Sequence, residues 1–144
     1  MERGNHLLKV FAFAKTIAGG EGLDRETQDV LEAAAVTHDV GIRVCFEKYG
    51  SCDGQKQELE GPPIAEKLLP ACGYAPAVCA RVCYLIGHHH TYVGIDGADY
   101  QILVEADFLV NIFENGMAQE AARKIRDNIF KTKTGRKLLT DLYL

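Results

Sequence analysis

The chain has 144 residues, with 16 Lys or Arg against 20 Asp or Glu, and therefore a formal net charge of −4. This length predicts one domain and buries enough surface that folding requires neither a disulfide nor a metal. Hydrophobic residues make up 47% and charged residues 25% of the chain, which excludes a disordered or collagen-like protein. The acidic balance disfavours a dedicated nucleic-acid-coating protein. The five histidines lie in only three places, at His6, at His38 and in the run 88–90.

The cysteines and the N-terminal residues indicate the cellular compartment. The five cysteines are odd in number, form no CxxC motif and have no zinc-finger spacing, so we interpret them as reduced, mostly buried thiols. The first ten residues lack the pattern of a secretory signal, and no apolar run approaches 18 residues. We therefore expect a cytoplasmic protein that has no membrane partner.

Apolar residues recur at three- and four-residue spacing along almost the whole chain, which predicts helices. Gly19-Gly20 marks the end of the first helix, and Asp24 and Asp99 are expected N-caps. Residues 49–57 have the composition of a loop. In chain order, the predicted helices are residues 7–18, 24–39, 62–73, 76–87, 100–114, 117–130 and 134–142.

No stretch alternates as a strand would, so the sequence predicts an all-α bundle of about six to seven helices. No repeat or composition shift divides it, and we expect a single domain over residues 1–144. The segment 117–144 is mildly basic, with seven Lys or Arg against three Asp or Glu. A solvated helix face explains this charge; a nucleic-acid, partner or homodimer contact is the alternative.

Two carboxylates, Glu105 and Asp107, lie in the apolar stretch 102–110 of the predicted helix 100–114. A buried carboxylate is costly unless it is paired or binds a cation. For Glu105, an ion pair with a lysine or a position at the helix rim is a sufficient explanation. For Asp107, between Ala106 and Phe108, we expect a histidine or a metal as partner.

A second polar pair, His38-Asp39, ends an Ala-rich helix in the segment AAAVTHDVG. His6, on the inner face of the first predicted helix, adds another imidazole. Together with Asp107, these residues offer two imidazoles and two carboxylates. That donor set suits a divalent first-row metal (Mn, Fe, Co, Ni or Zn) with open positions for water.

His6, His38-Asp39 and Asp107, in that order, resemble the H…HD…D signature of the HD-domain metal-dependent phosphohydrolases. The resemblance covers about residues 6–114. It implies an HD-type helical bundle with the metal site at its centre and His6, His38, Asp39 and Asp107 as ligands. It also implies hydrolysis of a phosphomonoester or phosphodiester of a small metabolite or nucleotide by a metal-bound hydroxide.

The run 88–90, in LIGHHHTY, resembles the extra histidines of family members that hold a second metal. His88 and His89 fit this pattern best, and His90 fits it less well. Two-metal members carry one more histidine where this chain reads QELEG, so Glu58 or Glu60 is the alternative ligand. An incidental polar patch also explains the run, and the sequence leaves open one metal or two.

The charges of Asp39 and Asp107 together cancel one divalent cation, so a phosphate dianion needs further positive groups. Lys9, Arg43 and Lys48 are the substrate-binding candidates, and each is equally explained as a surface charge. In the implied mechanism Asp39 takes the proton from water. His88 or His89 then protonates the leaving oxygen.

Two other functions are compatible with the same residues. Some HD-fold proteins are di-iron oxygenases, and the three consecutive histidines keep that activity open. A non-catalytic sensor module that binds a metal for structure or ligand capture is the third hypothesis. The substrate is not encoded in any pattern that we can interpret.

Overall fold

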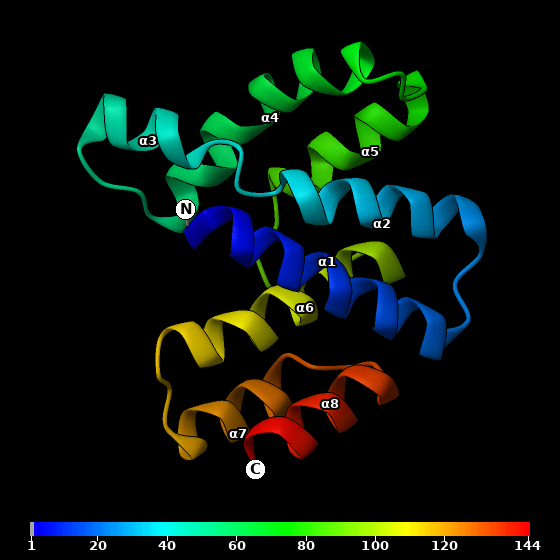
Figure 1. Ribbon diagram of the computed structural model, residues 1–144, viewed down its shortest axis with the longest axis vertical. Helices are drawn as coiled ribbons and strands as arrows, with labels where there is room; N and C mark the ends of the chain where they lie inside the picture. Colours follow the sequence, from blue (N-terminus) through cyan, green and yellow to red (C-terminus); the bar gives the residue numbers. More distant parts are fainter. Residues whose placement is uncertain (1) are drawn as a thin grey trace.

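The computed structural model describes residues 2–144, with side chains from residue 4 onward. No strand occurs among these residues, which confirms the all-α class (Figure 1). The helices are α1 (Glu2–Glu21), α2 (Arg25–Thr37), α3 (Ile42–Tyr49), α4 (Gly54–Ala71), α5 (Pro76–Ile86), α6 (Ala98–Glu114), α7 (Gln119–Asn128) and α8 (Lys133–Tyr143).

The largest difference from the expected helices lies at residues 42–61. The chain forms the additional helix α3, and α4 begins at Gly54 instead of near residue 62. Asp53 caps α4, because its side chain accepts a hydrogen bond of 2.9 Å from the Lys56 backbone N–H. Pro62 and Pro63 lie inside α4 and not at its start. Because this segment has a polar composition, the sequence did not indicate the end of α3 or the start of α4. Only residues 50–53 separate the two helices.

Two predicted helix ends also shift. α1 runs through Gly19-Gly20 and ends at Glu21. A side chain at Gly20 would collide with Thr134, so this glycine lets the start of α8 approach α1. At the other shifted end, Gly97 and not Asp99 is the N-cap of α6, and the buried Asp99 carboxylate pairs with Arg81 at 2.8 Å.

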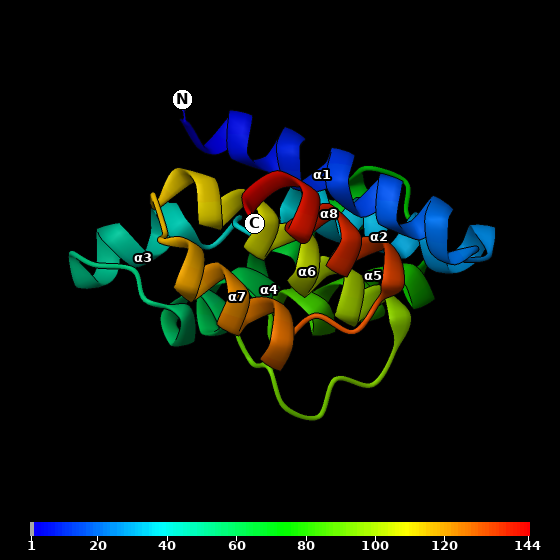
Figure 2. The ribbon, with the colours of Figure 1, turned by 90° about the horizontal axis from the view of Figure 1, so that it is seen from below.

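Helix α6 is the central helix of the molecule, as its apolar sequence predicts. It packs against α1, α2 and α8, and Figures 1 and 2 show it enclosed among these helices. The buried hydrophobic cluster draws side chains from α1, α2, α4, α5, α6, α7 and α8. Asp107 therefore belongs to a helix that is held from several sides, which fixes its position.

The fully buried Glu105 anchors the C-terminal helices to α6. Its carboxylate accepts hydrogen bonds from the backbone N–H groups of Lys131 and Thr132, at 2.8 and 3.0 Å, and from the Thr132 hydroxyl at 2.5 Å. Its partner is thus the turn between α7 and α8 rather than a lysine side chain or the solvent at a helix rim. Glu105 is a structural carboxylate, distinct from Asp107 two residues later.

Two glycines allow the turn after His38-Asp39 to lie directly on α4. A Cβ atom added at Gly41 would lie 2.7 Å from the backbone N of Gly61, closer than real Cβ atoms approach. A Cβ atom at Gly61 would in turn lie 2.6 Å from Cγ2 of Ile86 on α5. This close backbone contact fixes where the polar pair at the end of α2 projects.

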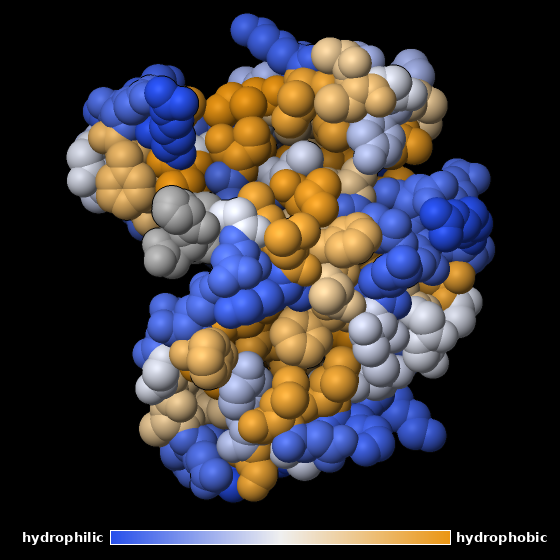
Figure 3. Space-filling model, in the orientation of Figure 1, coloured by the Kyte–Doolittle hydropathy of each residue, from blue (hydrophilic) through white to orange (hydrophobic). Residues whose placement is uncertain are grey.

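The face shown in Figure 3 carries hydrophobic side chains over α4 and along the groove between α1 and α8. Exposed Leu8, Phe113 and Leu142 contribute to the hydrophobic surface of the molecule. Within residues 2–144, no helix combines the length and the apolar character that a membrane crossing requires.

Candidate metal centre

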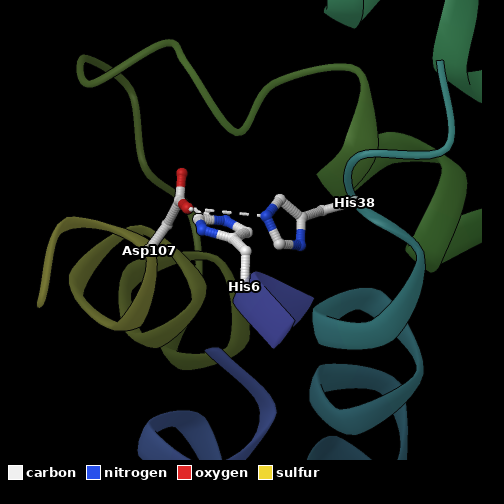
Figure 4. Close-up of side chains that lie close together, drawn as sticks. All are labelled: His6, His38 and Asp107. Atoms are coloured by element: carbon white, nitrogen blue, oxygen red, sulfur yellow. Dashed lines mark hydrogen bonds and ion pairs between the residues drawn. The ribbon is translucent and has the colours of Figure 1, made fainter. Parts of the chain in front are cut away.

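Three helices bring the signature residues together. His6 projects from α1, His38 caps the C-terminus of α2 with Asp39 following it, and Asp107 projects from α6 (Figure 4). One Asp107 oxygen, Oδ1, lies 3.1 Å from His6 Nε2 and 3.5 Å from His38 Nε2. One ligand atom from each of these three residues lies within 4.8 Å of the others. His6 and His38 are each only 1% exposed, and Asp107 is 6% exposed.

Asp39 completes the four-residue arrangement. Its two carboxylate oxygens lie 3.5 Å from His6 Nε2 and 3.4 Å from His38 Nε2. The same carboxylate also lines a cavity, together with Asp107. The structure therefore brings together all four residues that the resemblance implies as first-metal ligands.

In three imidazoles of this region the outer nitrogen Nδ1 is held by an oxygen. His6 Nδ1 donates to Glu114 at 2.8 Å, His38 Nδ1 to the Ala35 carbonyl at 2.8 Å, and His89 Nδ1 to the Ile86 carbonyl at 2.7 Å. A nitrogen that donates carries the proton, so in the neutral ring Nε2 keeps its lone pair. The three Nε2 atoms all face carboxylates of this centre.

Among the described residues, two buried side-chain polar atoms lack a hydrogen-bond partner. They are His38 Nε2 and His89 Nε2. A buried polar atom without a partner is costly, and native proteins rarely keep one. A cation between these lone pairs and the carboxylates would satisfy both. The centre is therefore suited to bind a divalent metal ion.

The pKa values of the centre agree with this donor set. Burial by itself would raise the pKa of Asp107, but the contacts with His38 and His6 outweigh it and hold that pKa well below its usual value. Burial, reinforced by the neighbouring His38 and His90, lowers the pKa of His89 to about 3. At neutral pH the centre thus presents an ionised carboxylate and a neutral imidazole. Of the two roles that the sequence predicts for His89, a neutral ring suits the metal ligand.

The three consecutive histidines point in different directions, because residues 87–90 form turns and not a helix. His89 faces the centre, with its ring centroid 5.2 Å from that of His38. His88 instead stacks on Tyr84 at 4.0 Å and donates from Nδ1 to the Tyr84 carbonyl. The structure does not bring His88 to the centre, either as a metal ligand or as a catalytic acid.

The glutamates considered for a second metal have other partners. The Glu60 carboxylate binds Lys48 Nζ at 3.0 Å and the Tyr49 hydroxyl at 2.6 Å. Glu58 accepts hydrogen bonds from the His90 backbone N–H and the Thr91 hydroxyl. Neither carboxylate is placed against the signature residues, because both are used to hold the segments around the site.

A cavity of about 310 Å³ opens beside Asp39 and Asp107. Its remaining lining residues are Ile42, Phe46, Cys52, Gln57, His90, Asn111 and Asn115. One wall, from α3, is apolar, whereas α6 contributes carboxamides at four-residue spacing after Asp107. Apart from Asp39 and Asp107, the cavity thus offers hydrogen bonds and apolar contacts.

None of the predicted substrate-binding cations lines this cavity. Lys9 lies over the Phe113 ring, 5.4 Å from its centroid, and Arg43 pairs with Glu47 at 3.1 Å. Lys48 is held by Glu60. Spacing along a helix does not show which neighbour a long, flexible side chain contacts, so the substrate-binding role of these three cations stays a prediction.

Sequence reasoning missed Glu114, Gln57 and the carboxamides of α6. Glu114 follows Asp107 by seven residues and therefore lies on the same helix face, a spacing from which it was predictable. No comparable signal marks Gln57, whose place in the cavity depends on how α4 packs. His90, which fitted the family pattern less well, is on the cavity wall.

One comparison with solved structures bears on this site. The fold is similar to the crystal structure of a predicted HD superfamily hydrolase from an uncultured Thermotogales bacterium, with a TM-score of 0.67 and 27% sequence identity. The similarity covers 95% of this chain and 71% of that chain. No protein-family model and no curated protein matches the chain.

Proposed function

Because this chain is a member of the HD superfamily, by its fold and by the residues of its metal centre, we propose that it is a metal-dependent phosphohydrolase. The observation that carries the proposal is the convergence of His6, His38, Asp39 and Asp107 beside an open cavity. The similar crystal structure, a predicted hydrolase, supports the same class of reaction.

His6, His38, Asp39 and Asp107 would hold the ion, with the Nε2 lone pair of His89 turned toward the same carboxylates. When bound there, a divalent ion supplies a water of lowered pKa and neutralises charge on a phosphoryl group. The two aspartates balance its charge, so the centre stays close to neutral before substrate binds.

Within this centre the protein residues have distinct tasks. Asp39 both faces the imidazoles and lines the cavity, which makes it the group that accepts a proton from the attacking water. Asp107, with its lowered pKa, stays ionised and offers a carboxylate ligand beside the Nε2 atoms of His6 and His38. The histidines themselves are buried, whereas Asp39 and Asp107 line the cavity through which water and substrate reach the centre.

The cavity favours a small substrate of low charge. Its volume of about 310 Å³ suits a phosphorylated metabolite or a nucleotide. Ile42 and Phe46 offer apolar contact to an organic group, while Asn111 and Asn115 offer hydrogen bonds. Because no described Lys or Arg lines the cavity, we expect phosphomonoesters or phosphodiesters to be preferred over polyphosphates.

The test is turnover of p-nitrophenyl phosphate and a nucleotide panel by metal-stripped protein after addition of Mn²⁺, Co²⁺ or Fe²⁺. We expect phosphate release that requires the metal and is lost in Asp39→Asn. Asp29→Asn, which changes a half-exposed aspartate of α2, is the matched control and should retain full activity. Metal-independent turnover, or unchanged activity in Asp39→Asn, would contradict the proposal.

A further inference from the structure

His90 differs from the imidazoles of the metal centre in how its ring nitrogens are used. Its Nε2 lies 2.9 Å from Oε1 of Gln57, and its Nδ1 lies 3.4 Å from the Tyr92 hydroxyl. In His38 and His89, by contrast, Nε2 has no hydrogen-bond partner. His38 and His89 turn Nε2 toward the metal centre, whereas Nε2 of His90 contacts the Gln57 carboxamide.

The position of this pair is well constrained. The His90 ring lies 4.0 Å from that of His89, and its backbone N–H donates to Glu58 at 2.9 Å. A Cβ atom at Gly54 would come within 2.9 Å of the His90 Cβ atom, so the ring needs a glycine at the start of α4. Gln57 and His90 both line the cavity next to Asp39 and Asp107.

The chemistry of this pair does not favour a metal. A ring nitrogen has one in-plane position, which holds either a proton or a lone pair. If the Gln57 oxygen accepts a hydrogen bond from His90, Nε2 carries the proton and cannot bind a metal. If the amide group is flipped and donates instead, the Nε2 lone pair accepts that hydrogen bond and is again not available to a metal. A carboxamide oxygen is also a harder and weaker ligand than imidazole for first-row metals such as Co, Ni and Zn.

We propose that this centre holds one divalent ion per chain and that Gln57 and His90 form a metal-free wall that positions the substrate. With its oxygen engaged by His90 and one amide N–H donated to Cys52, Gln57 keeps a second N–H donor for a phosphoryl or polar oxygen in the cavity. The metal count stands on the geometry of the imidazoles, whereas the positioning role rests on the proposed function.

Metal stoichiometry tests the first part. Stripped protein is saturated with Mn²⁺ or Co²⁺, desalted and measured by elemental analysis. We expect one ion per chain in the wild type and two in Gln57→His, where an imidazole replaces the carboxamide and frees His90. Gln55→His, which adds the same side chain at an exposed position of α4, is the control and should stay at one. Two ions in the wild type, or one in Gln57→His, would overturn the inference.

Steady-state kinetics with p-nitrophenyl phosphate tests the second part. Gln57→Leu should raise KM about tenfold, the effect of one lost hydrogen bond to a charged group, with kcat within about threefold. Its metal content should remain one per chain, and Gln55→Leu should match the wild type. An unchanged KM in Gln57→Leu would overturn the positioning role. Wild-type protein with two ions and turnover would overturn this inference and leave the proposed function standing. Wild-type protein with no bound metal and no turnover would contradict the proposed function itself.

Discussion

Glu114 contacts a residue of the candidate metal centre without belonging to the signature. It accepts the Nδ1–H of His6 at 2.8 Å, which fixes both the tautomer and the orientation of that ring. An outer carboxylate of this kind holds a ligand ready to bind and raises its basicity. One face of α6 thus lines the metal centre and its cavity over two turns, through Asp107, Asn111 and Glu114.

Glu114→Ala should therefore weaken metal binding about 10- to 100-fold, because His6 loses the group that orients it. The Glu114 side chain is 26% exposed, so the fold itself should change little. Competition with a chelating indicator measures the affinity, and Glu120→Ala, an exposed change in α7, is the control. An affinity equal to that of the wild type would show that Glu114 does not orient His6.

His89 predicts the pH dependence of stability of the metal-free protein. Its pKa is about 3 in the folded chain and returns to its ordinary value near 6.5 on unfolding. Between these pH values the unfolded chain binds a proton that the folded chain does not. The free energy of unfolding should therefore fall as pH drops below about 6.5, by up to about 1.4 kcal/mol per pH unit.

Urea unfolding between pH 4 and 7 measures this slope. Asp107 contributes in the same direction, but its lowered pKa places that contribution below pH 3.8, outside the range measured. His89→Gln removes the titrating group and should flatten the slope. A variant whose stability falls with pH as steeply as that of the wild type would contradict the assignment.

At the scale of elements, two glycines should respond to the same substitution in opposite ways. Gly41→Ala places a methyl group 2.7 Å from the Gly61 backbone and should cost about 1–3 kcal/mol through forced movement of the α2–α3 turn. Gly19→Ala lies inside α1 with open space around it and should stabilise the protein by about 1 kcal/mol.

Thermal or urea unfolding distinguishes the two variants, and metal binding adds a second readout. Gly41→Ala should also weaken metal affinity, because the same turn positions His38-Asp39. Gly19→Ala should leave affinity unchanged. Equal stability effects in the two variants would mean that α2 and α4 do not need the close approach that the structure shows.

The helices that carry the candidate metal centre were largely predictable, since α1, α2 and α6 have apolar residues at helical spacing. The ends were less so, because α1 continues to Glu21 and the N-cap of α6 is Gly97. Burial of Asp107 followed from the apolar sequence around it. The start of α4 was not predictable, because residues 50–57 have turn composition throughout. The directions of His88, His89 and His90 depend on how a turn packs between helices, which no local pattern specifies.

At the scale of the whole molecule, the described lining of the cavity carries negative and not positive side chains. The predicted substrate cations are bound elsewhere, and the cavity wall is made of carboxamides, an imidazole and apolar side chains. Asp39 and Asp107 therefore dominate the electrostatics of the centre among the described residues. A cation is the ligand that this arrangement attracts first.

The central claim is that His6, His38, Asp39 and Asp107 hold a divalent ion on which phosphoester hydrolysis depends. A titration of metal-stripped protein with Mn²⁺, followed by phosphate release, tests it most directly. We expect no release without metal, a rise that saturates at one equivalent per chain, and no rise in Asp107→Asn at that ratio. Release from the stripped protein, or an Asp107→Asn titration that follows the wild-type curve, would contradict it.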